Sequence, residues 1–387
     1  MKIMLVVSSM GSGGAERVAA SLVNAWAQRG DTVTLVITYS GRGACFYPLA
    51  PNVRCVFLAD RVKAGARMLQ YPARFRALRA LIRESAPDVV VSFLSNVNIT
   101  TILATRGLGI PVIASEHIDP SADGRSQLMS QMCRFVYPSA DLLTLLTDNM
   151  EASFRKMVPR VKRIEVVPNP LPDELLLLQP ETIEKSARKR LVAVGRLNMQ
   201  KQFDLLIDVF ATLAPEFPDW DLWIWGEGPE RAVLEAQVAQ LKMNERVLMP
   251  GKTTTPWEEM ARSDAFVLSS RYEGLPMAML EGMALGLATV AFDCKSGPRE
   301  LTRDGQDGLL VPAGDKAALI DALRRVMSDE ALRAELGRKA AASVRQRYSS
   351  PAILRQWDAI FAQLGARSRG GEGKSTAYAR AVTGEKA

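Results

Sequence analysis

The sequence predicts an α/β protein with two doubly wound, parallel-sheet domains, and three observations lead to this fold class. Short apolar segments rich in Val, Ile and Leu alternate with helical stretches along most of the 387 residues. Segments that are apolar along their whole length are typical of parallel strands covered by helices on both faces. They fall into two series, separated by the proline-dense stretch 168–172, in which proline holds the backbone extended. Two such series predict two domains.

The apolar pattern places the elements in order along the chain. The first series of predicted strands comprises residues 2–7, 32–37, 53–57, 88–93, 111–115, 142–146 and 164–167. The second series comprises residues 190–194, 221–225, 246–249, 265–268, 288–292 and 308–311. Helices over 315–347 are predicted to end the second domain, and an amphipathic helix over 351–364 follows. The last residues, 366–387, are rich in Gly, Ser, Lys and Arg, which predicts a disordered tail.

Composition indicates a soluble globular protein. Hydrophobic residues make up 48% of the chain, and no apolar run reaches the roughly 18 residues that a membrane-spanning helix needs. The N-terminal apolar segment is predicted to be a core strand rather than a signal peptide, because polar serines and a glycine loop follow it. Four scattered cysteines without a C-x-x-C pair favour a reducing cytoplasm over a structural zinc site. The single histidine, His117, excludes a multi-histidine metal site.

The formal charge of +7 is concentrated in one segment. Between Arg54 and Arg83 there are eight basic residues, among them Arg67 and Arg74, against one acid, Asp60. Such a segment suits an anionic membrane face or a diphosphate head group. A solvated helix with one face in the core explains the same pattern equally well. Nucleic acid is disfavoured, since the chain shows no recognised nucleic-acid-binding module.

Two carboxylates lie eight residues apart, at Glu273 and Glu281, after the predicted strand 265–268. A helix is expected to begin near Gly274, with Glu273 just outside it and Glu281 about two turns within. Backbone N–H groups at a helix start favour phosphate, and a carboxylate beside them accepts hydrogen bonds from sugar hydroxyls. This arrangement suits a nucleotide sugar. The alternative is a strand–loop–helix unit with two solvated glutamates.

Two further loops carry ligand-binding signals. Gly13 and Gly14 follow the first strand and precede a helix, which allows a ligand close to the backbone, although a tight turn without ligand is the alternative. Glu16 stands where the dinucleotide pattern G-x-G-x-x-G requires glycine, so a nicotinamide cofactor is disfavoured. Arg196 and Lys201 follow strand 190–194, where they are suited to clamp a diphosphate or are simply surface cations.

Further candidate residues lie at the ends of other predicted strands. His117 follows strand 111–115 and is placed to contact a sugar hydroxyl or an acceptor, with packing as an even alternative. The loops at 225–229 and 296–300 also leave the carboxyl ends of strands and would border the same site. Asp219 and Asp221 match the D-x-D metal motif, but they precede or begin a strand and therefore lie at the wrong end of the sheet. No metal site is predicted.

Together these motifs resemble the retaining glycosyltransferases of family GT4, which have the GT-B fold of two doubly wound domains facing across a cleft. The resemblance covers nearly all of residues 1–364. It rests on Gly13-Gly14-Ala15-Glu16, Pro168-Asn169-Pro170, Gly195-Arg196-Leu197 with Lys201, Trp225-Gly226-Glu227-Gly228-Pro229, Glu273-x7-Glu281, and Asp304-Gly305 through Pro312. It implies transfer of a sugar from a nucleotide diphosphate without a metal or other cofactor.

The resemblance also implies a role for individual residues. The residues implied to be catalytic are His117, Arg196, Lys201 and Glu273. Those implied to bind the donor are Gly13, Gly14, Arg196, Lys201, Glu273, Gly274, Leu275, Pro276 and Glu281. Those implied to bind the acceptor are Gly14, Glu16, His117, Arg67 and Arg74. Residues 1–170 would bind the acceptor and be joined by a returning helix at 350–365, residues 171–189 would be a linker, and residues 190–349 would bind the nucleotide sugar.

Two strings, 13–17 and 292–300, are similar to the branch that extends polyprenyl-diphosphate-linked glycans, including α-N-acetylgalactosaminyltransferases and O-antigen and capsule enzymes. The expected function is transfer of a hexose or N-acetylhexosamine from a UDP-sugar to such a glycan in bacterial surface polysaccharide synthesis. The expected location is the cytoplasm, peripheral on the inner face of the membrane. The alternatives are a UDP-sugar 2-epimerase, disfavoured by the single histidine and the Glu273-x7-Glu281 pattern, and a non-catalytic nucleotide-sugar-binding protein.

Overall fold

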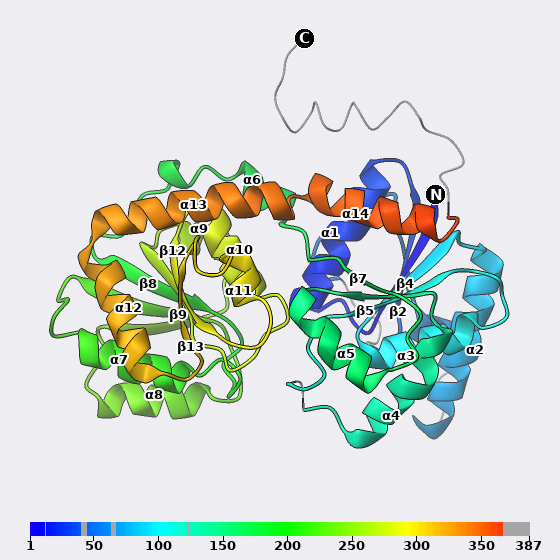
Figure 1. Ribbon diagram of the computed structural model, residues 1–387, viewed down its shortest axis with the longest axis horizontal. Coiled ribbons are helices and arrows are strands. Elements are labelled where there is room, and N and C mark those ends of the chain that lie inside the picture. Colours follow the sequence, from blue (N-terminus) through cyan, green and yellow to red (C-terminus); the bar gives the residue numbers. More distant parts are fainter. Residues whose placement is uncertain (12, 40–44, 63–66, 123, 367–387) are drawn as a thin grey trace, which may run out of the picture. The chain divides into compact units, whose positions relative to one another are not determined.

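A computed structural model describes residues 1–11, 13–39, 45–62, 67–122 and 124–366, and its strands form two parallel sheets (Figure 1). The chain divides into two compact units. Unit 1 comprises Met1–Pro170 and the segment from Ser350 onward, and unit 2 comprises Leu171–Ser349. For residues 67–70 the description is limited to the backbone.

Unit 1 contains a sheet of seven parallel strands in the order β3-β2-β1-β4-β5-β6-β7. The strands are β1 (Lys2–Val7), β2 (Thr32–Ile37), β3 (Arg54–Phe57), β4 (Val89–Phe93), β5 (Val112–Glu116), β6 (Leu142–Leu145) and β7 (Ile164–Val166). Every residue of β4, β5 and β6 is buried. Burial on both faces is why these strands appear as continuous apolar runs in the sequence.

Helices cover the unit 1 sheet (Figure 1). They are α1 (Gly14–Gln28), α2 (Arg67–Ser85), α3 (Ser95–Thr105), α4 (Gln127–Val136), α5 (Glu151–Met157) and α14 (Ser350–Gln363), with 3-10 turns η1 (Leu58–Arg61), η2 (Tyr137–Ser139) and η3 (Asp148–Met150). The C-terminal helix α14 packs on α1: the rings of Trp26 and Trp357 meet edge to face at 5.8 Å, and Phe361 lies against both. Arg29 pairs with Asp358 at 2.6 Å beside this aromatic contact.

Unit 2 contains six parallel strands in the order β10-β9-β8-β11-β12-β13. They are β8 (Lys189–Val194), β9 (Trp220–Trp225), β10 (Val247–Gly251), β11 (Ala265–Leu268), β12 (Ala288–Asp293) and β13 (Leu309–Pro312). The helical elements are α6 (Asp173–Leu177), η4 (Pro180–Thr182), α7 (Phe203–Leu213), α8 (Arg231–Gln240), α9 (Pro256–Ala261), α10 (Met277–Ala284), α11 (Pro298–Leu301), α12 (Lys316–Ser328) and α13 (Glu330–Tyr348). A core of Leu, Val, Ile and Phe side chains with the fully buried Trp220 joins these helices to the sheet.

The structure confirms all thirteen predicted strands to within two residues at either end. The helical stretch predicted at 315–347 is two helices, because Asp329 is extended and its carboxylate caps α13 by accepting from Leu332 N at 2.9 Å. The segment 171–189 carries α6 and η4 and belongs to unit 2. Of the tail predicted at 366–387, Ala366 is buried and its N–H bonds the carbonyl of Phe361 at 3.0 Å. The rest lies outside the described residues.

Each sheet has a point where the strand order reverses, between β1 and β4 in unit 1 and between β8 and β11 in unit 2. Loops that leave the carboxyl ends of strands on either side of such a reversal form the ligand-binding crevice of doubly wound sheets. In unit 2 these are the loops after β8 and β11, which carry the predicted donor-binding residues. In unit 1 the loop after β1 carries Gly13 and Gly14, and His117 follows β5, the neighbour of β4.

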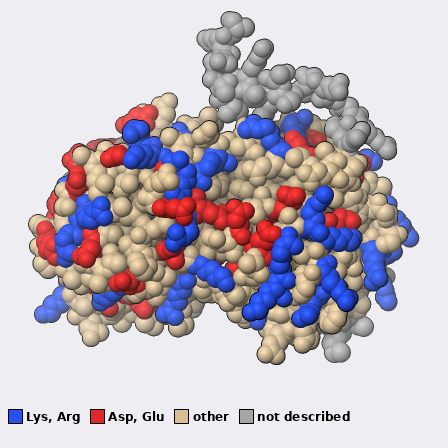
Figure 2. All heavy atoms as spheres, viewed as in Figure 1, with Lys and Arg blue, Asp and Glu red and all other residues tan. Residues whose placement is uncertain are grey.

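The surface of unit 1 carries a concentration of positive charge. Figure 2 shows long Lys and Arg side chains over its lower half, where Figure 1 places α2, α4 and α5. On α2, Arg76 and Arg83 are exposed, whereas Arg79 is half-buried and donates to the carbonyls of Ala104 and Arg106 at 2.8 Å each. The basic segment predicted from the sequence is therefore partly solvated and partly used to hold α2 against the end of α3.

Candidate functional site

The two loops at the unit 2 switch point are joined by an ion pair between Lys201 and Glu273. Lys201 Nζ donates to Glu273 Oε1 at 2.6 Å. The two side chains are 17% and 8% exposed, so the pair is largely but not completely shielded from water. The structure therefore brings together two residues that the sequence could only place separately, each at the end of a strand.

Backbone and side-chain hydrogen bonds hold the same two loops together. Ser269 Oγ donates to the carbonyl of Lys201 at 2.7 Å, and Arg271 N donates to the carbonyl of Gln200 at 2.8 Å. Gln200 Nε2 returns a bond to the carbonyl of Tyr272 at 2.8 Å. Because three bonds flank the ion pair, the positions of the ammonium and the carboxylate are set by the scaffold.

A third loop, after β12, supports the backbone at Gly274, Leu275 and Pro276. Gly297 has φ of +91°, and a Cβ placed there would collide with Pro276 Cδ and with the carbonyl oxygen of Gly274. Glycine is therefore required at 297 by both conformation and close approach. Cys294, in the same loop, is buried, and this burial together with the nearby Glu273 charge raises the pKa of its thiol to about 12.

The helix that follows the loop after β11 begins later than predicted. α10 starts at Met277, not near Gly274, because Pro276 is extended, with φ of −71° and ψ of 95°, and serves as the N-cap. Glu281 is therefore the fifth helical residue, about one turn inside rather than two. Its side chain is 2% exposed. Gly274 and Leu275 lie in the loop and offer backbone groups ahead of the helix.

Arg196 lies on the exposed side of the loop after β8. Among the described residues, no hydrogen bond or ion pair holds its guanidinium, so it is available to an anion. The backbone beneath it is fixed, since Leu197 N donates to the carbonyl of Glu227 at 3.1 Å. A Cβ at Gly226 would collide with the carbonyl oxygen of Gly195. The glycine turn after β9 thus packs closely against the loop after β8.

In unit 1 the glycine loop after β1 is closed by its own glutamate. Gly13 is the N-cap of α1, and the carboxylate of Glu16 lies so close that a Cβ at Gly13 would collide with it. Glu16 Oε1 also accepts from Ser9 Oγ at 2.6 Å. A Cβ at Gly14, by contrast, would meet nothing within 4 Å. Gly14 is therefore open to a ligand, while Glu16 is engaged within the loop.

His117 lies directly after β5 and is 7% exposed. Its ring is 4.4 Å from that of Phe93, and its Nε2 is 3.4 Å from Ser115 Oγ. Burial lowers the pKa of His117 to about 4, so the imidazole is neutral near pH 7. A neutral imidazole can donate one hydrogen bond and accept another, but it does not supply a positive charge.

A buried polar network beside His117 was missed in the sequence. Glu116 is 2% exposed and accepts hydrogen bonds from the hydroxyl of Tyr137, from Asn98 Nδ2 at 3.2 Å, from Ser95 Oγ at 3.0 Å and from Arg125 Nη2 at 3.4 Å. Burial raises the pKa of Glu116 despite these partners. The available signal was Asn98, an amide in the mostly apolar stretch 97–104 of the sequence.

The two arginines predicted to meet the acceptor differ in what the structure describes. Arg74, on α2, donates from Nη1 to the carbonyls of Thr38 and Tyr39 at 3.1 and 3.2 Å. It therefore reaches the carboxyl end of β2, the same edge of the sheet as Gly14 and His117. Arg67 is the first residue of α2, and its side chain lies outside the described part of the chain.

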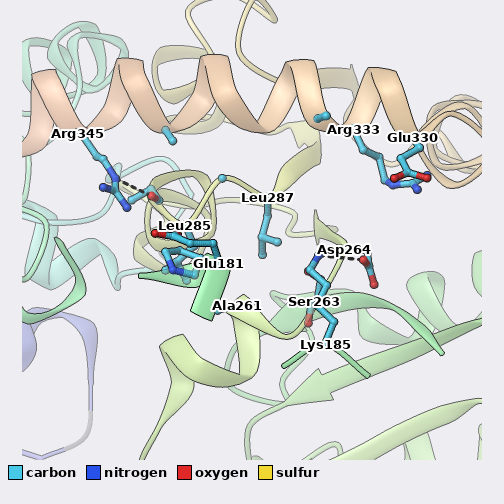
Figure 3. Close-up of a pocket in the computed structure, with 15 residues that line it drawn as sticks. Glu181, Lys185, Ala261, Ser263, Asp264, Leu285, Leu287, Glu330, Arg333 and Arg345 are labelled. Carbon is cyan, nitrogen blue, oxygen red and sulfur yellow. Dashed lines mark hydrogen bonds and ion pairs between the residues drawn. The ribbon is translucent and has the colours of Figure 1, made fainter. Parts of the chain in front are cut away.

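A cavity of about 490 Å³ lies at the opposite edge of the unit 2 sheet (Figure 3). It is lined by residues that precede β11 and β12, such as Asp264 and Leu287, and by α13. Its cations already have partners: Lys185 pairs with Asp264 at 3.0 Å, and Arg345 Nε donates to the carbonyl of Ala284 at 2.9 Å. None of the predicted site residues lines it.

The D-x-D pair also lies at this amino-terminal edge. Asp219 pairs with Lys189 at 2.9 Å, and Asp221, at the start of β9, pairs with Arg188 and Arg246 at 2.7 and 3.0 Å. These carboxylates are used in structural ion pairs. Within the described ranges, His, Cys, Asp and Glu side chains form no group of three or more that would suit a metal ion.

Two doubly wound units, each with a switch point in its strand order, make up the GT-B fold, and solved structures show the same fold. The HepE protein of Anabaena in complex with UDP aligns with a TM-score of 0.80 at 20% identity, covering 94% of this chain and 100% of that one. At this level of identity the likeness establishes the fold alone.

The chain belongs to the group 1, GT4-like glycosyltransferases. Residues 13–170 match the glycosyl transferase 4-like domain, and residues 178–343 match the glycosyl transferases group 1 domain. A Campylobacter jejuni α-1,4-N-acetyl-D-galactosaminyltransferase, named for a diphospho-undecaprenol-linked glycan, is 28% identical over 94% of this chain and 99% of its own length. A Streptomyces coelicolor exopolysaccharide phosphotransferase is 34% identical over 59% of this chain but only 24% of its own length.

Proposed function

We propose that the protein transfers a hexose or N-acetylhexosamine from a UDP-sugar to a lipid-diphosphate-linked glycan, with retention at the anomeric carbon, in bacterial surface polysaccharide synthesis. The observation that carries the proposal is the Lys201–Glu273 pair at the unit 2 switch point. It puts a cation for phosphate and a carboxylate for sugar hydroxyls 2.6 Å apart. The named acceptor of the Campylobacter relative supports a polyprenyl-diphosphate glycan as acceptor.

On the donor side, each residue has a chemical task that its position supports. Arg196 is exposed and unengaged among the described residues, so its guanidinium can bind the diphosphate through two parallel hydrogen bonds. Lys201 adds a second cation, already oriented by Glu273. Glu273 retains acceptor capacity for hydroxyls of the transferred sugar. The backbone of Gly274, Leu275 and Pro276 supports phosphate and sugar, and Glu281 binds the ribose.

The reaction itself requires little from the protein beyond charge stabilisation and positioning. To retain the anomeric configuration in one step, the acceptor hydroxyl attacks the anomeric carbon from the same face that the phosphate leaves. The phosphate oxygen takes the proton of that hydroxyl as the sugar bond breaks, so no enzymic base is needed. Arg196 and Lys201 stabilise the negative charge that develops on the diphosphate. His117, neutral near pH 7, contributes a hydrogen bond rather than a charge.

On the acceptor side, unit 1 offers the open backbone at Gly14, the imidazole of His117 and the guanidinium of Arg74 at one edge of its sheet. Arg67 and Glu16 complete the proposed acceptor set. A cytoplasmic location, peripheral on the inner face of the membrane, follows from an acceptor held in the bilayer by its lipid. In the part of the chain that the structure describes, no helix combines the length and apolar character needed to span a bilayer.

The test is a donor titration followed by product analysis. Calorimetry with UDP and GDP on the wild type and on Glu281→Ala should show UDP binding that the substitution weakens. Incubation with UDP-sugars and a polyprenyl-diphosphate disaccharide should then yield one α-linked product by NMR, with donor consumption that depends on acceptor. Donor converted in the absence of acceptor would instead indicate a 2-epimerase, and binding without turnover would indicate a non-catalytic protein.

A further inference from the structure

The helix α4 presents an apolar stripe to solvent. Leu128 is 67% exposed, Met132 37% and Phe135 79%, while Cys133 is the buried residue of this helix. Spacings of four and three residues place these three side chains on one face. The helix is well formed at its start, since Ser126 Oγ caps Met129 N at 3.2 Å. Single exposed apolar residues are ordinary, but a contiguous stripe marks a surface that meets something else.

The surroundings of this stripe are positively charged. Arg134 is exposed on α4 itself, and α5, which contacts α4, leads into a segment with five cations and no acid. Those cations are Arg155, Lys156, Arg160, Lys162 and Arg163. Arg155 pairs with Glu151 at 2.7 Å and Lys162 with Asp141 at 3.7 Å, whereas Arg134, Lys156 and Arg160 have no ion pair with any described residue.

We propose that α4 is a membrane-docking helix that seats on an anionic bilayer. Leu128, Met132 and Phe135 enter the boundary between head groups and acyl chains, and the neighbouring cations contact lipid phosphates. The inference rests on the proposed function, because a lipid-linked acceptor requires the enzyme at the membrane. It assigns the contact to α4 and α5 rather than to the basic segment at 54–83.

Two features favour lipid over a protein partner. A stripe of three side chains on a ten-residue helix is far smaller than the roughly 800 Å² per partner of a stable protein interface. Long Arg and Lys stems around it can extend their charges to the phosphate layer while their carbons stay with the apolar face. A second copy of the chain would instead have to bring like charges together at this surface.

The test is sedimentation with vesicles that contain no polyprenyl diphosphate. Wild type is expected to bind vesicles of phosphatidylglycerol and phosphatidylcholine, and to bind phosphatidylcholine alone much more weakly. The double variant Leu128→Ser/Phe135→Ser should lose about tenfold or more of this affinity. The matched control, Leu177→Ser/Val233→Ser, removes two side chains that are 78% and 61% exposed in unit 2 and should bind as wild type does.

The proposal would be overturned if the wild type did not bind anionic vesicles, or if the double variant bound them as tightly as the wild type does. It would also be overturned if light scattering showed that the wild type is a dimer and that the double variant is not. UDP titration and transfer to a soluble acceptor fragment separate this outcome from failure of the proposed function. Both should be unchanged in Leu128→Ser/Phe135→Ser. Lost vesicle binding beside normal UDP binding and transfer is the expected pattern.

Discussion

Lys201 Nζ and Glu273 Oε1 lie 2.6 Å apart, although 72 residues separate them in the sequence. The pair joins the loops on either side of the point where the unit 2 strand order reverses. Because both side chains are largely buried and the flanking loops are bonded to each other, the ammonium is oriented before any ligand binds. Catalysis of glycosyl transfer benefits from such preorganisation, since stabilising the departing diphosphate then costs little reorganisation.

Replacing Arg196 with Ala should slow turnover while leaving the fold intact. Loss of one preorganised charge-stabilising donor typically costs about 2.7–4 kcal/mol of barrier, a fall of about 10²–10³ in kcat. The melting temperature should hold, because no described residue bonds this side chain. Met199→Ala, at a 67% exposed position on the same loop, is the control and should keep wild-type kinetics. Near-normal turnover in Arg196→Ala would remove this residue from the mechanism.

The Lys201–Glu273 pair should show strong coupling in a double-mutant cycle. Lys201→Ala leaves a largely buried carboxylate unpaired, which typically costs about 3–5 kcal/mol. Glu273→Gln in the same chain should recover part of that loss, because an amide needs no counter-charge. Thermal unfolding of the two single variants and the double variant measures the coupling.

Activity separates the two roles of this pair. Both single variants and the double variant should lose transfer, since each lacks a group that we propose contacts the donor. If the losses of unfolding free energy in the two single variants simply add up to the loss in the double variant, the ion pair is not formed in solution as it is in the structure.

The strands were predictable because a parallel strand that is buried on both faces consists of a continuous run of apolar residues. The strand-end positions of Lys201, Glu273 and His117 followed from the same pattern. Their pairing did not, because contact between the ends of β8 and β11 depends on the order of strands in the sheet, which no local signal records. α10 starts three residues later than predicted, because Pro276 is extended and keeps the turn at Gly274 out of the helix.

The partners of buried polar groups were the hardest features to find. Glu116 draws its hydrogen bonds from α3, η2 and the segment before α4, which are brought together only by folding. Glu16 is predicted to meet the acceptor, and the structure adds local contacts: its carboxylate accepts from Ser9 and lies over Gly13. The sequence places Glu16 beside a glycine loop, but the motif does not indicate that Ser9 is its hydrogen-bond partner.

Gly297→Ala should destabilise the chain more than a matched glycine change elsewhere. At φ of +91° a non-glycine residue carries about 1–3 kcal/mol of strain, and here its Cβ also collides with Pro276. Gly314→Ala is the control, because φ is +77° and its Cβ would meet nothing within 4 Å. The difference between the two melting temperatures isolates the collision. UDP affinity should fall in Gly297→Ala alone, because the loop that it supports carries the proposed donor contacts.

His117 should titrate with a pKa of about 4, well below its ordinary value of 6.5, because burial disfavours the imidazolium. As it is the only histidine in the chain, its Hε1 proton gives a single histidine NMR signal that can be followed with pH. The sign of the stability effect follows from proton counts. Between pH 6.5 and about 4 the unfolded state binds a proton that the folded state excludes. Stability due to this group is therefore complete above pH 6.5 and falls as the pH drops toward 4, by about 3 kcal/mol in total.

His117→Asn isolates this contribution from that of the neighbouring Glu116, whose raised pKa acts in the opposite direction. The difference in unfolding free energy between wild type and His117→Asn should decline from pH 6.5 to 4 and be flat from pH 7 to 8. Turnover of the wild type should likewise show no step from His117 between pH 6 and 8, since the ring stays neutral throughout that range. An NMR midpoint near 6.5 would mean that the ring is solvated rather than buried, and the predicted pH dependence of stability would then be absent.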